Sequence, residues 1–207
     1  MEKPKGKRTL QEEATRESIV KTAMRIYGEQ GFSVPVSVIA NEAGVSHGSI
    51  IVHFTSKEEL FRSATERFFE DTGKRMHDIA MAQVGFKECL TEFLELVEEH
   101  ELFYKRLTME LSNMPADIKI MMASLRSANM LHFEMAAERD MRLGKIRELP
   151  VRMMFNTWMG LVFYYLQNGD LFAPGESVIK RFKGELVEFF STLVGEEEKT
   201  ENPNADV

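Results

Sequence analysis

Apolar residues recur three and four positions apart along most of the chain, which is the spacing of an amphipathic helix. The first such run covers residues 12–30, and Gly31 directly after it favours a helix end. Later runs predict helices over residues 85–100, 101–114 (stopped by Pro115), 116–144, 149–170 and 176–195. No segment has a convincing strand pattern, so the sequence predicts an all-α protein.

Two short apolar runs lie close together between residues 35 and 54. Pro35 suits the beginning of one helix, Gly44 can take the left-handed conformation of a sharp turn, and Ser46 can cap a second helix that reaches about His53. Two short helices joined in this way form a helix-turn-helix unit. The apolar positions expected to hold it together are Ile39, Ala43, Val45, Ile50 and Phe54, with the small Ala40 where the helices approach closely.

The stretch "TSKEEL" (55–60) predicts the start of a further, long helix that extends to about Ala82. Thr55 and Ser56 precede Glu58 and Glu59, which is the pattern of a capping box. The first run and the two short helices therefore predict an N-terminal three-helix, helix-turn-helix domain over residues 1–57, which ends where this long helix begins. Residues 58–195 would form a second helical domain, and the charged residues 196–207 are predicted to be a disordered acidic tail.

The net charge of −7 is unevenly distributed. Residues 1–57 hold eight Lys/Arg against six Asp/Glu, whereas residues 58–207 hold eighteen against twenty-seven. Lys3, Lys5, Lys7 and Arg8 form a basic N-terminal arm, which either contacts DNA phosphates or is a solvated tail. No apolar run approaches the ~20 residues of a membrane helix. The lone Cys89 excludes an intrachain disulfide, which fits a cytoplasmic protein, and its apolar neighbours predict a buried, unreactive thiol.

The second helix of a helix-turn-helix unit places its N-terminal residues at base edges in the DNA major groove. In this chain those residues are Ser46, His47, Gly48 and Ser49, whose small or hydrogen-bonding side chains suit close approach to DNA. The alternative is a helical hairpin that only packs inside a bundle.

Residues 13–61 resemble the N-terminal domain of the TetR family of transcriptional regulators. The resemblance rests on "YGEQGF" at the end of the first helix and on "IANEAGVSHGSIIVHFTSKEELF". It implies a homodimer that binds double-stranded, palindromic operator DNA and acts as a repressor. It also implies that a small molecule bound by the C-terminal domain releases the DNA, and that residues 149–195 supply two helices to an intersubunit bundle.

Two positions depart from the family pattern. Ile51 stands where the family usually has an aromatic residue, often a Tyr that contacts DNA, and Ile51 can offer only apolar contact, for example to a thymine methyl. Val34 and Pro35 lie where the family often has hydroxyl residues, so Ser37 could supply the phosphate contact instead. The DNA-binding residues expected from the motif and the resemblance are Ser37, Ser46, His47, Gly48, Ser49, Ile51, His53 and Lys57.

The effector is expected to be apolar or aromatic, because the C-terminal helices are rich in Met and aromatic residues. The residues expected around it are Phe103, Met109, Met121, Phe133, Phe155, Trp158 and Tyr164. These residues could equally serve the subunit core or the dimer interface.

No catalytic group, cofactor site or metal site is predicted. His77, His100 and His132 lack the spacing of metal ligands, and the Ser–His pairs near residue 50 have no acidic partner. The remaining alternative to a regulator is a helical adaptor whose hairpin does not bind DNA.

Overall fold

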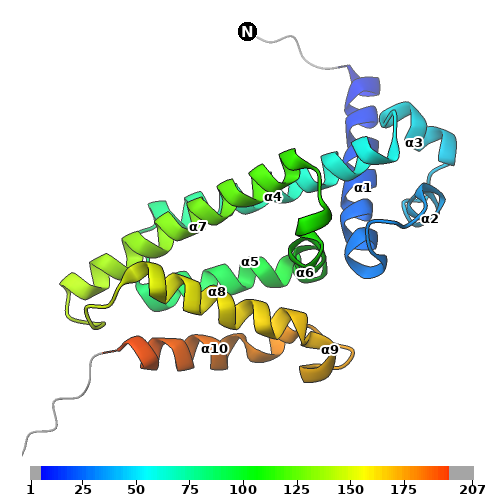
Figure 1. Cartoon of the computed structure of the whole chain (residues 1–207). Helices are drawn as coiled ribbons and strands as arrows, with labels where there is room; N and C mark the ends of the chain where they lie inside the picture. The colour runs from blue at the N-terminus through cyan, green and yellow to red at the C-terminus, as the bar shows by residue number, and fades with distance from the viewer. Residues whose placement is uncertain (1–5, 196–207) are drawn as a thin grey trace, which may run out of the picture. The chain divides into compact units, whose positions relative to one another are not determined.

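The computed structural model describes residues 6–195, and these form ten α-helices and one 3-10 turn (Figure 1). The elements are α1 (Lys7–Gln30), α2 (Val36–Glu42), α3 (His47–His53), α4 (Lys57–Met81), α5 (Phe86–Glu99), α6 (Glu101–Met109), η1 (Leu111–Asn113), α7 (Ala116–Arg142), α8 (Val151–Gln167), α9 (Gly169–Phe172) and α10 (Val178–Val194). Within residues 6–195 the only extended pairing is an isolated bridge between Ile146 and Gly195. The predicted all-α class is confirmed. The predicted acidic tail, and Lys3 and Lys5 of the basic arm, lie outside the described residues.

The chain divides into two compact units. The first runs to His77 and also includes Leu96–Ser127, and the second comprises Asp78–Glu95 and the chain from Ala128 onward. The helices α4, α5 and α7 therefore contribute residues to both units. The predicted domain boundary at residue 57 falls on the first residue of α4 and stays a prediction.

The helix-turn-helix unit forms as the sequence predicts. Gly31 ends α1 with φ at 87°, and Gly44 makes the turn between α2 and α3 with φ at 67°, a left-handed conformation that glycine adopts without strain. Ile39, Ile50 and Phe54 are all buried, and α2 packs against both α1 and α3. The tight turn therefore folds α3 back so that one face of it joins the core.

Hydrogen bonds confirm the predicted cap of α4. The Ser56 hydroxyl accepts from the Glu59 N–H at 3.1 Å, and the Glu59 carboxylate accepts from the Thr55 N–H at 2.7 Å and from the Thr55 hydroxyl at 2.6 Å. The bond from the Thr55 hydroxyl, and to a lesser extent the bond from its N–H, lowers the pKa of Glu59 below its ordinary value. The first turn of α4 is thus fixed directly after α3.

Two predicted helices are shorter than expected. The run 101–114 divides into α6 and η1, because Pro115 disfavours a helical conformation at Met114 and the preceding residues close tighter i to i+3 bonds instead. The run 149–170 divides at Asn168, whose side chain donates to the Tyr164 carbonyl at 2.8 Å and ends α8 before α9. The prediction of one continuous helix was wrong in both places.

In the first unit, α1 and α6 cross at a glycine. A Cβ added to Gly28 would lie 2.8 Å from the Phe103 backbone nitrogen and 3.0 Å from the Leu102 Cβ. The Gly28 carbonyl also accepts from Arg106 Nε at 3.5 Å. The absence of a side chain at residue 28 is therefore what lets the two backbones approach so closely.

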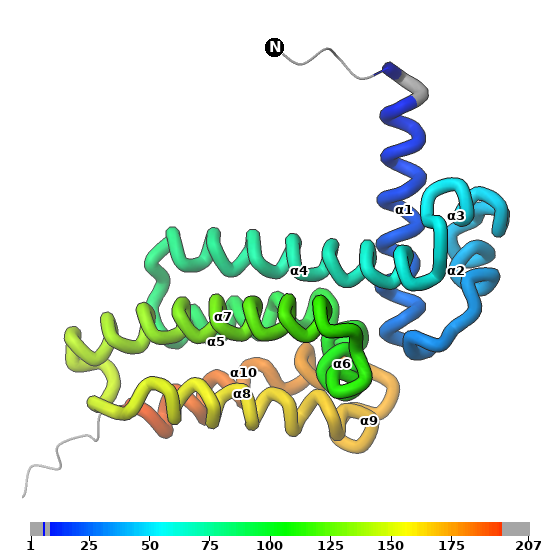
Figure 2. Tube along the Cα trace, turned by 45° about the horizontal axis from the view of Figure 1, so that its top comes forward, coloured from blue at the N-terminus to red at the C-terminus, as the bar shows by residue number. Residues whose placement is uncertain are grey.

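In the second unit, α8 and α10 lie side by side (Figures 1 and 2). Trp158 of α8 is 1% exposed, and its ring packs 5.2 Å from that of Phe190 on α10. The ring of Phe86 lies 6.4 Å from Phe190 and 4.9 Å from Phe133. An aromatic core therefore joins α5, α7, α8 and α10 within this unit.

Candidate DNA-binding surface and effector cleft

A side-chain cap from Ser46 stabilises the N-terminus of α3. The Ser46 side chain accepts from the Ser49 N–H at 3.0 Å, as the sequence predicts, so the Ser46 hydroxyl is already engaged in holding the helix. His47 and Gly48 are exposed and Ser49 is partly buried. The predicted base-reading residues therefore lie together at an accessible helix end.

The outward face of α3 continues with two aliphatic side chains. Ile51 is 50% exposed, and Val52 is 83% exposed, although neighbouring Ile50 is 1% exposed in the core. His53 is partly buried at the end of the helix, with its ring 6.4 Å from that of Phe54. Of these two residues, only Ile51 was expected from the sequence to contact DNA.

Three cations of α1 have partners within the first unit. Arg25 of α1 contacts Glu42 of α2 at 2.6 Å and Glu29 at 3.1 Å, and the formation of both bonds raises the pKa of Arg25. Arg16 donates to the Ser63 hydroxyl at 2.9 Å and lies 4.8 Å from the centre of the Phe54 ring. Lys21 lies 3.6 Å from Glu17.

Lys57 differs from these three residues. It lies in the first turn of α4, partly buried, and it forms no ion pair within the described part of the chain. Ser37, the other predicted phosphate contact, is exposed in the first turn of α2. The predicted DNA-binding residues thus belong to α2, α3 and the start of α4 in one compact unit.

The seven predicted effector residues do not form one group in either unit. Phe103, Met109 and Met121 belong to the first unit, where Phe103 packs against Phe32 and Phe68 and Met109 is half exposed. The other four belong to the second unit: Phe133, Phe155, Trp158 and Tyr164. Of these, Phe133 and Phe155 touch each other at 5.4 Å, whereas Tyr164 is 57% exposed.

The second unit contains a cleft of about 280 Å³ that none of these seven residues lines. Its apolar wall comes mainly from Ile79, Val84, Cys89, Met135 and Ala136. His132, Glu138, Arg139 and Arg142 supply polar groups. Cys89 is buried, as predicted, and burial raises the pKa of its thiol to about 11.

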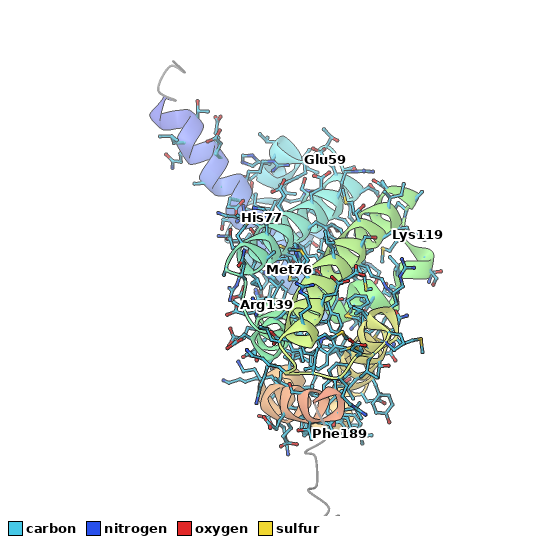
Figure 3. All side chains as sticks on the ribbon, turned by 90° about the vertical axis from the view of Figure 1, so that its left-hand side faces the viewer. Glu59, Met76, His77, Lys119, Arg139 and Phe189 are labelled. Carbon is cyan, nitrogen blue, oxygen red and sulfur yellow. The ribbon has the colours of Figure 1, made fainter. Side chains whose placement is uncertain are left out.

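The loop between α4 and α5 is held in place by two neighbouring residues of α7. Gln83 has φ at 50°, and its carbonyl accepts a hydrogen bond from Arg139, which Figure 3 labels on α7. Asp140, 5% exposed, accepts from the Phe86 N–H at 2.9 Å and from Arg139 Nε at 3.4 Å. Sequence reasoning missed both residues, because they lie more than fifty positions from the loop that they bind.

Comparison with known proteins agrees with this geometry. Residues 19–64 match the model of the bacterial regulatory proteins of the tetR family. The N-terminal helix-turn-helix domain of this chain is therefore of the TetR type. The uncharacterised helix-turn-helix regulator YerO of Bacillus subtilis is 37% identical over 65 residues, which are 31% of this chain and 22% of YerO. IcaR, the negative transcriptional regulator of a biofilm operon in Staphylococcus epidermidis, is 26% identical over 104 residues, which are 48% of this chain and 55% of IcaR.

The TetR-type fold extends beyond the matched sequence. A regulator from Saccharomonospora viridis, solved in complex with choline, covers 89% of this chain with a TM-score of 0.74 at 19% identity, and all of its own chain is matched. The sequence matches, by contrast, span well under two thirds of YerO and IcaR. The family and these relatives are transcriptional regulators, not enzymes.

The described residues contain neither a membrane-spanning helix nor a metal-binding cluster. In residues 6–195, no helix combines the length and apolarity needed to cross a membrane. The same residues contain no group of three or more His, Cys, Asp or Glu side chains placed to hold a metal ion.

Proposed function

We propose that this chain is a ligand-responsive repressor that binds a palindromic operator as a homodimer. The observation that carries the proposal is the exposed N-terminal end of α3, where Ser46, His47, Gly48 and Ser49 lie together on a helix-turn-helix unit of the TetR family. In such a unit the second helix enters the major groove, and phosphate contacts from flanking elements set its register. Lys57 and Ser37 flank α3 and suit that role.

Dimerisation through residues 149–195 is supported by exposed apolar side chains on α8, α9 and α10. Met153, Leu171 and Phe189 are 64%, 73% and 60% exposed, although most apolar residues of these helices are buried. On α8 and α10, Gly160 and Gly184 are exposed with open space beside them. Glycines at such positions permit close approach of another helix.

An apolar or aromatic effector is supported by the wall chemistry of the cleft, which is near the lower end of the usual size for a small-molecule site, roughly 300–1,000 Å³. The sequence-based site around Trp158 is the other candidate. In either site, an effector that binds the DNA-free conformation more tightly lowers the affinity for DNA. Bound DNA then lowers the affinity for the effector by the same factor, because coupling between two sites is reciprocal.

The test begins with selection of bound fragments from genomic DNA, followed by footprinting. We expect a palindrome that is protected on both half-sites, whereas a helical adaptor would select no sequence. Titration with apolar compounds should then lower operator affinity. Since Trp158 is the only tryptophan and Cys89 lines the cleft, a change in Trp158 fluorescence or in Cys89 labelling shows which site the compound occupies.

A further inference from the structure

The face of α3 directed away from the core is aliphatic. Gly48, Ile51 and Val52 are three and four positions apart, so they share one side of the helix, roughly opposite the buried Ile50. A Cβ built on Gly48 would meet nothing closer than the Ser46 hydroxyl at 3.7 Å. Because residue 48 is a glycine, it has no side chain that could cover Ile51 and Val52.

The same helix lacks the usual residues for reading purines. Residues 46–54, "SHGSIIVHF", contain no Arg, Lys, Asn or Gln, which are the side chains that bind guanine or adenine through two hydrogen bonds. The Ser46 hydroxyl is engaged by the Ser49 N–H. The two imidazoles, the Ser49 hydroxyl and the O–H of Ser46, which still has its own proton to donate, are the side-chain groups left to make hydrogen bonds to bases.

The thymine C5-methyl is the apolar group that an unmodified major groove presents. We propose that Ile51 and Val52 bind thymine methyl groups in the operator and that Val52 is a residue that determines specificity. This inference rests on the proposed function, since it requires α3 to lie in the major groove. It adds that operator choice depends on methyl contact in place of bidentate purine recognition.

A protein partner fits this patch less well than DNA. A stable protein interface buries about 800 Å² on each side. Here two aliphatic side chains are surrounded by Ser, His and Gly on a helix of seven residues. Lys57 in the next helix, which forms no ion pair among the described residues, also favours a polyanion.

The test replaces each thymine of the selected operator, one at a time, with deoxyuridine, which lacks only the methyl group. We expect one or two positions in each half-site at which affinity falls about fourfold, the effect of exposing one buried methyl. In Val52→Ala, affinity for the thymine operator should fall and the thymine-to-uracil difference should disappear at the position that Val52 contacts. Ile51→Ala should do the same at its own position.

His47→Ala is the matched control, since His47 is also exposed on α3 but has no aliphatic group, and this variant should keep the full thymine-to-uracil difference. If the operator is bound but every uracil substitution is silent, the inference is wrong and the proposed function stands. The inference is also wrong if Val52→Ala weakens binding to thymine and uracil operators equally. If no sequence is selected at all, the proposed function itself fails.

Discussion

Single residues decide how this chain can meet DNA. Of the cations on α1 and at the start of α4 whose side chains the structure describes, Arg16, Lys21 and Arg25 all have intramolecular partners. Lys57 has no ion-pair partner there, and it lies at the N-terminus of a 25-residue helix whose dipole also favours an anion. Lys57 is therefore the described residue best placed to bind a phosphate.

Lys57→Ala should weaken binding to all DNA sequences to a similar extent. Because the variant neutralises one phosphate fewer, its binding releases fewer counterions from the DNA. The slope of log affinity against log salt should therefore flatten by about one unit for each DNA-binding domain. Fluorescence anisotropy at several salt concentrations measures this slope. Lys21→Ala, which removes a cation already paired with Glu17, is the control and should leave the slope unchanged. An unchanged slope in Lys57→Ala would remove this residue from the interface.

Cys89 should react slowly with thiol reagents in the native protein. Its pKa of about 11 leaves very little thiolate at pH 7.5, and the side chain is only 5% exposed. Alkylation by iodoacetamide should be at least tenfold faster in denaturant, and a ligand that fills the cleft should slow native alkylation further. Native alkylation as fast as that of a free thiol would contradict the burial of this group.

Sequence patterns were informative for residues whose role depends on near neighbours. The caps at Ser46 and Ser56, the left-handed Gly44 and the buried Cys89 were all predicted, because each depends on a few adjacent positions. Val52 was not singled out, because apolar periodicity and helix propensity do not show which face of a short helix stays exposed to solvent. Asp140 was missed because its partner, the Phe86 N–H, is fifty-four residues away.

At the scale of elements, the backbones of α1 and α6 cross closely at Gly28. Gly28→Ala should destabilise the fold by about 1–3 kcal/mol, since the new methyl would overlap the Phe103 nitrogen and the backbone must shift. Urea unfolding measures the loss. Gly73→Ala is the matched control: Gly73 lies within α4 with open space beside it, so the same change should stabilise by up to about 1 kcal/mol. Equal effects of the two variants would contradict the crossing geometry.

The corner between α5 and α6 should be sensitive to acid through His100. Burial lowers the pKa of His100, although Glu99 and Asp71 act in the opposite direction. The folded state therefore binds fewer protons than the unfolded state, so this contribution to stability is present above pH ~6.5 and is lost as pH falls below it.

The measurement is the urea midpoint at pH 7.5 and at pH 5.5. His100→Gln should lose less stability between the two pH values than the wild type does. His77→Gln, at an exposed position of α4, should keep the wild-type difference. If His100→Gln behaves like His77→Gln, the buried imidazole does not cause the acid sensitivity.

Element types followed from the sequence better than element ends did. The long helices were predicted because their apolar periodicity extends over several turns. The divisions at Glu110 and Asn168 were not predicted, because they depend on 3-10 bonds before Pro115 and on one side-chain bond to the Tyr164 carbonyl. Such ends reflect competition between hydrogen bonds of similar strength.

For the whole molecule, the proposed assembly predicts a clear effect of surface charge. Phe189 is 60% exposed on α10 (Figure 3), so Phe189→Glu should leave the monomer folded but place a charge in the proposed dimer interface. Sedimentation should show that the dissociation constant of the dimer rises at least a hundredfold, and operator binding should be lost. Leu143→Glu is the control, because Leu143 is 62% exposed just beyond α7 and outside the predicted segment. A Phe189→Glu protein that remains dimeric would place the interface elsewhere.

The resemblance to the TetR family followed from one quarter of the chain, whereas the all-α class followed from the periodicity of most of it. Residues 13–61 carry the motif, and the match to the family model covers residues 19–64 of the same stretch. The effector site could not be located in this way, because a pocket depends on which of many apolar helix faces remain unfilled. The cleft beside Cys89 arises from the loop at Gln83 and from α7, and neither has a distinctive sequence pattern.

The internal pairing of arginines also affects how such a protein would search a genome. Sliding on random DNA depends on attraction between free cations and phosphates, and a protein with few of them dissociates quickly from sequences that do not match. Because Arg16, Lys21 and Arg25 are paired, the time spent on wrong sites would be set by Lys57 and by the N-terminal cations Lys3, Lys5, Lys7 and Arg8. Discrimination between sites would then arise mainly from base contacts of α3.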